Sequence, residues 1–461
     1  MKACHSIVPV FDDPNLVSAA GLVPVLALGS RAGLEDRIAQ GLSVPSANPV
    51  AKARSVVAGM LAGADSIDDL DLLRAGGLAR VVAGVRAPST LGTFLRSFTH
   101  GHVQQLDKIG AGVLAGLAGQ VSGLLAGGRD AEGMVFIDVD DTIRAVHGYA
   151  KQAAGFGYSR VRGLNIQLAT ASTPTSAPVI ARARLRRGNV ISHQGAPRLV
   201  AQAITTTRAA GASGQVMVRA DSAYYLRAFC AAAVRHGAWF SVTARMNPQV
   251  IKAIAAIGED AWTPIKYPKA MWDELAGGWV SDAQVAEVPF TAFASLPKAQ
   301  QIGCRLVVRR VKRLQPRTCD GTVQGELFAD WRHHAFVTNS TLTTIEADQR
   351  HRDHAIVEQV IAELKDGPLA HLPSGSYAAN AAWVSFAALA FNLARAASIA
   401  AGMATARWAT LRRRIISVPA RLASTGRRLV LHLPTRWPWA PAWSALWDSI
   451  CATGPPTAAT T

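Results

Sequence analysis

Three carboxylates follow one apolar segment of the chain. Residues 136–142 read FIDVDDT, and the acids are Asp138, Asp140 and Asp141. The apolar run 134–140 predicts a central β-strand, on which Asp138 and Asp140 point to the same side. Like charges that are buried together are costly unless a cation lies between them. Oxygen ligands of this kind suit Mg²⁺ or Mn²⁺, so the segment predicts a divalent-metal site.

A second acid stands at the end of another apolar strand. Residues 218–222 read VRADS, and Asp221 follows the predicted strand 216–221 and precedes a predicted helix. The 81 residues from Asp140 to Asp221 leave room for two further strands and a helix. Asp221 alone also fits a helix N-cap. Two acids at two strand ends together favour the metal site.

A third candidate acid lies on an amphipathic helix predicted at 352–365. One face of this helix is apolar, and a second stripe is formed by side chains three, four and seven residues apart, namely His351, His354, Glu358 and Lys365. Glu363 lies about 140° around the helix from Glu358, so Glu358 is the favoured functional acid. The alternative is a salt-bridged surface stripe.

The order strand-Asp, strand-Asp, β-rich insertion and helix-Glu resembles the DDE transposases of bacterial insertion sequences. The branch with a β-rich insertion between the second Asp and the Glu carries a Y-x-x-R-x-x-x-E-x-x-x-x-x-x-K signature, and Glu358 and Lys365 match its last two positions. His351 and His354 stand where Tyr and Arg are usual. The segments 146–152 (VHGYAKQ) and 161–165 (VRGLN) also resemble this family.

This resemblance implies an α/β fold with a ribonuclease H-like mixed-sheet catalytic core. Three carboxylates would hold two divalent ions, Mg²⁺ or Mn²⁺ in its place, for cleavage and transfer of DNA strands. The first acid of the family precedes one residue and a Thr, which points to Asp140, with Asp138 as the alternative; Asp221 and Glu358 complete the set. Contacts to DNA are implied for the basic side chains Lys365, His354, His351, Arg352, Lys151 and His147.

Two other functions compete with this hypothesis. The motif D-x-D-x-T at 138–142 also fits haloacid-dehalogenase-type phosphatases, with Asp138 as nucleophile and Asp140 as acid/base. Such motifs usually open their domain, whereas about 130 residues precede this one, and a later G-D-x-x-x-D loop is missing. The second rival is an inactive DNA-binding relic of a transposase.

Composition and charge fit a DNA-binding protein. Lys and Arg number 48 and Asp and Glu 31, for a net charge of +17, which favours a polyanionic partner. The five cysteines form no C-x-x-C pair, which excludes zinc ribbons and zinc fingers. The uncharged stretch 377–393 predicts a buried helix, because it contains Asn380, Ser385 and Asn392. We expect a cytoplasmic, nucleoid-associated protein without a membrane partner.

The domain organisation follows from the same patterns. We expect a helical DNA-binding region at 1–130, the first part of the catalytic core at 131–245, an inserted β-rich module at 246–345, the remainder of the core at 346–400, and a basic Arg/Trp-rich tail at 401–461. The resemblance implies that the chain binds the terminal inverted repeats of its element and a target DNA as a homodimer.

Overall fold

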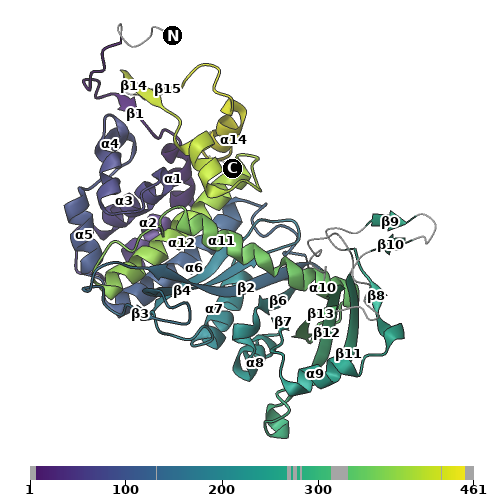
Figure 1. Cartoon of the computed structure of the whole chain (residues 1–461). Coiled ribbons are helices and arrows are strands. Elements are labelled where there is room, and N and C mark those ends of the chain that lie inside the picture. The colour runs from purple at the N-terminus through teal and green to yellow at the C-terminus, as the bar shows by residue number, and fades with distance from the viewer. Residues whose placement is uncertain are drawn as a thin grey trace, which may run out of the picture.

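Five neighbouring strands carry the acidic segments and form the middle of the molecule (Figure 1). The computed structural model describes residues 7–130, 132–266, 271–273, 278–280, 283–312, 331–426 and 428–451. The five strands are β2 (Met134–Ala145), β4 (Arg162–Ser172), β5 (Val179–Arg186), β6 (Gln215–Ala220) and β7 (Trp239–Thr243). Their order is β5-β4-β2-β6-β7. β4 runs antiparallel to both β5 and β2, and β6 and β7 run parallel to β2, which is the predicted ribonuclease H-like arrangement.

Helices cover both faces of this part of the sheet. The crossovers between the parallel strands are α7 (Ala196–Ala209) and α8 (Arg227–Arg235), and α11 (Ile356–Lys365) packs on β2 from later in the chain. Val135, Ile137 and Val139 are fully buried on one face of β2, and Phe136 and Asp138 are buried on the other. A strand of β-branched residues buried on both sides is typical of the centre of such a sheet.

The predicted insertion continues the same sheet. The strands predicted at 287–293, 304–310 and 334–338 fall on β11 (Ala283–Ala292), β12 (Ile302–Lys312) and β13 (Trp331–Thr338), which form an antiparallel meander. β13 pairs with β7, so the backbone hydrogen bonds of the core sheet run on into the insertion (Figure 1). The short elements of this region are α9 (Pro248–Ala255), β8 (Thr263–Pro264), β9 (Met271–Asp273) and β10 (Gly278–Val280).

The region before β2 is helical, as predicted. Its helices are α1 (Leu22–Arg31), α2 (Leu34–Gly41), α3 (Pro49–Ala62), α4 (Leu78–Val81), α5 (Pro88–Arg96) and α6 (His100–Gln120). Thr99 starts α6 with a capping box to His102. The acids of 68–74 lie in a 3₁₀ helix. Whether this region binds DNA stays a prediction.

The long helix α12 (Tyr377–Ala400) is the buried helix that the sequence predicts. Its length and hydropathy are those of a candidate membrane span, but 83% of its apolar window is buried inside the protein. It packs against α3, α5, α6 and β5 and joins the N-terminal helices to the sheet (Figure 1). A mostly buried core helix passes the same length test, so it gives only weak support to a membrane span.

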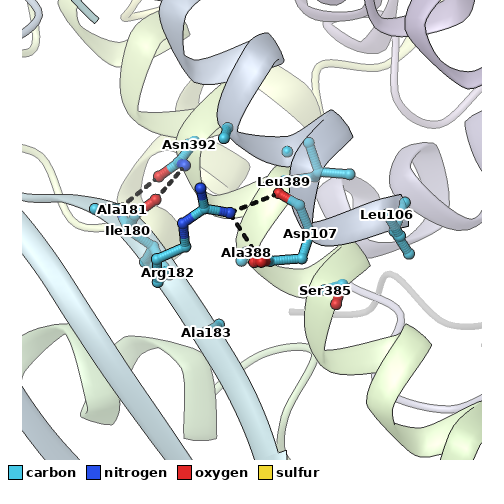
Figure 2. A pocket seen from close by; sticks show the side chains of 12 residues that line it. Leu106, Asp107, Ile180, Ala181, Arg182, Ala183, Ser385, Ala388, Leu389 and Asn392 are labelled. Atoms are coloured by element: carbon cyan, nitrogen blue, oxygen red, sulfur yellow. Dashed lines mark hydrogen bonds and ion pairs between the residues drawn. The ribbon is translucent and has the colours of Figure 1, made fainter. Parts of the chain in front are cut away.

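Polar side chains fix this junction (Figure 2). Asn392 of α12 accepts a hydrogen bond from the Ile180 N–H at 2.7 Å and donates to the Ile180 carbonyl at 2.8 Å. The register of β4 and β5 shifts beside this point, between Ala169 and Thr170. Two residues after Ile180, Arg182 of β5 donates to the carboxylate of Asp107 on α6 at 2.8 Å. The side chain of Asn392 therefore replaces a strand partner where β5 is irregular.

The termini of the described chain meet on the N-terminal helices. β1 (Leu16–Val17) pairs with β14 (Ala420–Thr425), which pairs with β15 (Arg428–His432). The rest of the tail forms α13 (Trp408–Leu411), a π-helical turn (Arg412–Ile416) and α14 (Ala440–Ile450). Trp408 and Trp443 are buried, so part of the tryptophan content of the tail serves packing. The predicted nucleic-acid contact of the tail stays a prediction.

We predict that Asn392→Leu destabilises the protein by about 2–3 kcal/mol. Leucine has a similar volume, but it leaves the N–H and the carbonyl of Ile180 without partners in a buried place. Urea unfolding monitored by circular dichroism measures the change. Ser385→Ala is the matched control on the same helix, because the Ser385 hydroxyl bonds only to its own helix at Ala381. An equal loss in both variants would contradict this role of Asn392.

Candidate active site

Asp140 and Asp221 lie side by side at one edge of the core. β2 and β6 are parallel, and Val139 of β2 pairs with Ala220 of β6. The residue that follows each of these two is an aspartate, Asp140 or Asp221. Asp221 also accepts a hydrogen bond from the Ala223 N–H at 3.0 Å and caps a short 3₁₀ helix (Ser222–Tyr224). Asp221 is therefore an N-cap, as the alternative predicted, and it also lies next to Asp140.

Asp138 is held in a buried ion pair. It is 0% exposed, and Arg219 donates to its two oxygens at 2.6 and 2.8 Å. His354 Nδ1 lies 3.2 Å from the same carboxylate, and the Arg219 guanidinium lies over the ring of Phe136. Burial alone would raise the pKa of Asp138, but Arg219 and His354 hold it below its ordinary value.

This geometry does not favour the expectation that Asp138 binds metal or replaces Asp140 as the first acid. Both oxygens of Asp138 already accept hydrogen bonds from Arg219, and no surface of the side chain is open. The same geometry removes Asp138 as the nucleophile of a phosphatase, because an attacking carboxylate must reach its substrate. Asp138 instead fixes the positions of Arg219 and His354 by its contacts with them.

Asp141 is neutralised on the opposite face of β2. Arg186 of β5 donates to it at 2.8 Å, Tyr224 at 3.1 Å, and Asn165 also donates. Sequence reasoning missed both arginines. For Arg219 a signal exists, since it precedes Asp221 by two residues and must share its face of the strand. Arg186 lies 45 residues from Asp141, and its role depends on how the strands pair.

Asp140 and Asp221 have no such partner. In the described part of the chain, the only hydrogen bond donated to Asp140 comes from the Asp141 N–H at 2.7 Å, and neither acid pairs with a Lys or Arg. Burial raises the pKa of Asp140 to about 6, and the charges of Asp221 and Asp141 add to the effect. Burial and Asp141 likewise raise the pKa of Asp221. Asp140 is partly buried and Asp221 is exposed, and two adjacent carboxylates without a cation fit a divalent metal ion.

Helix α11 brings a lysine to this pair and keeps its glutamate on the outside. Burial and the charge of Arg144 lower the pKa of Lys365, and the charge of Asp140 acts in the opposite direction. Lys365 is therefore within electrostatic reach of Asp140. Glu358 is exposed and lines a cavity of about 500 Å³ together with Arg407 and Arg412. Among the described residues no three His, Cys, Asp or Glu side chains converge as a metal cluster. The structure thus brings Asp140 and Asp221 together but does not add Glu358.

The helix predicted at 352–365 is broken. α10 (Thr344–Arg352) ends where a 3₁₀ turn (Asp353–Ala355) begins, and α11 follows. This break turns the two histidines to different neighbours. His354 joins Asp138, whereas His351 stacks on Phe336 and bonds through both ring nitrogens to Ser241 and Thr243.

Three of the basic side chains predicted to contact DNA have partners inside the protein. Burial holds the pKa of His351 well below its ordinary value, so it is neutral and does not fit a phosphate contact. The Lys151 ammonium donates to the Leu372 and Ser374 carbonyls, and burial lowers its pKa. Arg352 pairs with Asp348 at 2.9 Å. His147 is exposed, and its contact with DNA stays a prediction.

The whole chain matches one protein family. Residues 2–454 match the family model described as Transposase DDE domain group 1. The chain belongs to the DDE transposases. Among solved structures it is similar to the piggyBac transposase in a synaptic complex with hairpin DNA, with 9% identity and a TM-score of 0.38 over 90% of this chain and 80% of that chain. No curated protein matches it. DDE transposases act on DNA and generally use divalent metals.

We predict that Mg²⁺ raises the melting temperature of this transposase through Asp140 and Asp221. A ligand that binds only the folded state stabilises it, so the rise should disappear in Asp140→Asn and in Asp221→Asn. The rise should also shrink as the pH falls through about 6, because protons compete for Asp140. Differential scanning fluorimetry measures both effects. Asp366→Asn, which replaces an exposed acid after α11, is the control.

The same raised pKa has a consequence without metal. Ionisation of Asp140 costs the folded state stability as the pH rises from the ordinary pKa of 3.8 through about 6. Asp140→Asn should therefore be more stable than the parent at pH 7.5 in EDTA, by on the order of 3 kcal/mol at most, and the difference should vanish near pH 4. A parent that is more stable than Asp140→Asn at pH 7.5 would contradict the raised pKa.

We predict a large loss of stability when the buried pair is broken. Arg219→Met leaves the Asp138 charge without a partner and should cost about 3–5 kcal/mol. The double variant Asp138→Leu/Arg219→Met should recover much of this loss in urea unfolding. The exposed pair Arg74–Asp71 provides the control, since Arg74→Met should change stability by less than about 1 kcal/mol. A double variant as unstable as the single one would argue against the charge as the cause.

Proposed function

We propose that this transposase binds the terminal inverted repeats of an insertion sequence, cuts the DNA strands there and joins them to a target. The observation that carries this proposal is the pair of adjacent carboxylates without a cation, Asp140 and Asp221. They lie at the edge of a ribonuclease H-like sheet in a chain of net charge +17. Contacts to phosphates dominate the affinity of proteins for DNA and give it a steep salt dependence.

Asp140, Asp221 and Glu358 would hold the divalent ions, which we propose to be two Mg²⁺ ions that Mn²⁺ can replace. When bound, such ions activate the attacking water or 3′-hydroxyl and stabilise the leaving oxygen. Asp140 and Asp221 are fixed by paired strands, and Glu358 shares its helix stripe with Lys365. The proposal requires Glu358 to move toward the first two acids when the ions bind.

The chain provides positive charge around these acids. Lys365 lies near Asp140, and His354, oriented by Asp138, interacts electrostatically with both Asp140 and Asp221. We assign Lys365 and His354 to the phosphate at the reacting strand. Exposed Arg407 and half-buried Arg412 face Glu358 across the cavity beside α11 and would contact the strand further along.

The rival functions fare differently. A haloacid-dehalogenase-type phosphatase needs Asp138 as an accessible nucleophile, which its pairing with Arg219 prevents. An inactive DNA-binding relic would keep the fold and lose cleavage, so it is an outcome of the cleavage test. We further propose a homodimer on two DNA ends and a location at the bacterial nucleoid.

We predict that Asp140→Asn, Asp221→Asn and Glu358→Gln each abolish DNA cleavage and leave DNA binding within about twofold. Sequencing the DNA on both sides of the gene supplies the inverted repeats, and a labelled duplex that ends in one repeat is the substrate, with Mg²⁺ or Mn²⁺. Each carboxylate would serve the transition state more than the binding of DNA, so the rate falls without a loss of affinity.

The controls separate the alternatives. Asp260→Asn should cleave normally, because this exposed acid lies in the short 3₁₀ helix Glu259–Ala261 and belongs to none of the proposed contacts. Binding without cleavage by the parent protein in either metal would identify a relic. Normal cleavage by Glu358→Gln would move the third acid to another residue. Binding that does not weaken between low and high salt would contradict a DNA function altogether.

A further inference from the structure

The connection between β2 and β4 exposes an unusual set of aromatic side chains. Within the residues that the structure describes, five large aromatic side chains are prominently exposed, and three of them lie in residues 146–162. Tyr149 is 100%, Phe156 67% and Tyr158 72% exposed. Exposed apolar side chains that gather in one place usually mark a binding surface. We call residues 146–162 the aromatic segment.

The aromatic segment lies beside the acidic edge. It leaves the end of β2 only a few residues after Asp140, and a methyl group on Gly157 would come within 3.9 Å of the Ile143 side chain of β2. Although Tyr158 is mostly exposed, partial desolvation raises its pKa, and the negative charges of Asp141, Asp140 and Asp221 raise it further. Its hydroxyl is therefore within electrostatic reach of the carboxylates that we assign to metal.

The backbone of the segment is fixed, although its aromatic rings are exposed. The short strand β3 (Gly155–Phe156) pairs with β4, and the Gly188 N–H donates to the Ala153 carbonyl at 3.0 Å. Gly188 packs so closely that a Cβ would lie 1.9 Å from the Gly163 carbonyl oxygen. Lys151 and the Gln152 N–H bind the 372–375 loop. The rings are thus presented by a rigid support, which lowers the entropy lost on binding.

The charge of the segment selects an anionic partner. Residues 146–162 contain no Asp or Glu, and they include two arginines, a lysine and a histidine. Arg160 and His147 are exposed, and Arg162 lies over the Tyr149 ring, with its guanidinium 5.9 Å from the ring centre. Aromatic rings interleaved with cations bind unpaired nucleic acid, because bases stack on the rings and phosphates meet the cations.

We propose that the aromatic segment binds unpaired nucleotides of the DNA end that lies in the active site, with Tyr149, Phe156 and Tyr158 stacking on bases and Arg160 and His147 contacting phosphates. This rests on the proposed function. Cleavage near the end of a duplex requires the strand to separate from its complement or to bend, and a stacking surface beside the acids stabilises the separated bases. A duplex with blunt ends would leave the rings without a partner.

The test compares two DNA probes on a protein that cannot cut them. Full-length Asp140→Asn protein is titrated against a fluorescent duplex with a blunt end and against the same duplex with three unpaired nucleotides at the end, in EDTA. We expect tighter binding of the tailed duplex. Tyr149→Ala and Tyr158→Ala should each weaken the tailed complex by about fivefold or more and leave the blunt complex unchanged. Tyr158→Phe should keep the preference, because the ring remains.

A matched control and three outcomes make the result decisive. Phe11 is as exposed as the three rings but lies at the far end of the chain, so Phe11→Ala should keep the preference for the tail. Equal binding of both probes, unaffected by the tyrosine variants, would overturn the inference and leave the proposed function standing. If the tyrosine variants changed only the oligomeric state, measured by light scattering, the aromatic segment would be a contact between copies of the chain. That result would also overturn the inference. No binding of either probe would overturn the proposed function with it.

Discussion

Four carboxylates meet at one edge of the sheet, and their mutual repulsion is the constraint on which the site depends. Arginines from neighbouring strands neutralise two of them, Arg219 at Asp138 and Arg186 at Asp141. These two pairs lie on opposite faces of β2 and fix the strand in register. They leave Asp140 and Asp221 close together and without a cation from Lys or Arg in the described chain, so negative charge is concentrated at this edge.

The rest of the fold keeps this edge rigid. β2 pairs with β4 on one side and β6 on the other, and the insertion adds strands beyond β7 without a break in the ladder. On the other side, Asn392 of α12 completes the irregular β5, and β5 in turn provides Arg186. Backbone pairing therefore links the acids to the insertion, and α12 joins this sheet to the N-terminal helices.

Patterns local in the chain predict much of this structure, and contacts between distant segments explain the rest. The apolar runs before Asp140 and Asp221 predict their strands, and uncharged residues with Asn392 predict the buried α12. The spacing of polar residues does not show the 3₁₀ turn at 353–355, which separates the environments of His351 and His354. The spacing also does not show that Arg219 pairs with Asp138, because this contact depends on the register of β2 against β6.

The position of Glu358 follows from the same electrostatics. A third carboxylate beside Asp140 would add to the repulsion that, with burial, already brings its pKa to about 6. Among the described residues, the basic side chains that act on the pair are His354, which contacts Asp138, and Lys365, whose own pKa burial lowers. Glu358 lies instead beside a cavity that Arg407 and Arg412 also line. The strands thus fix Asp140 and Asp221 side by side, while the helix keeps Glu358 exposed beside the cavity.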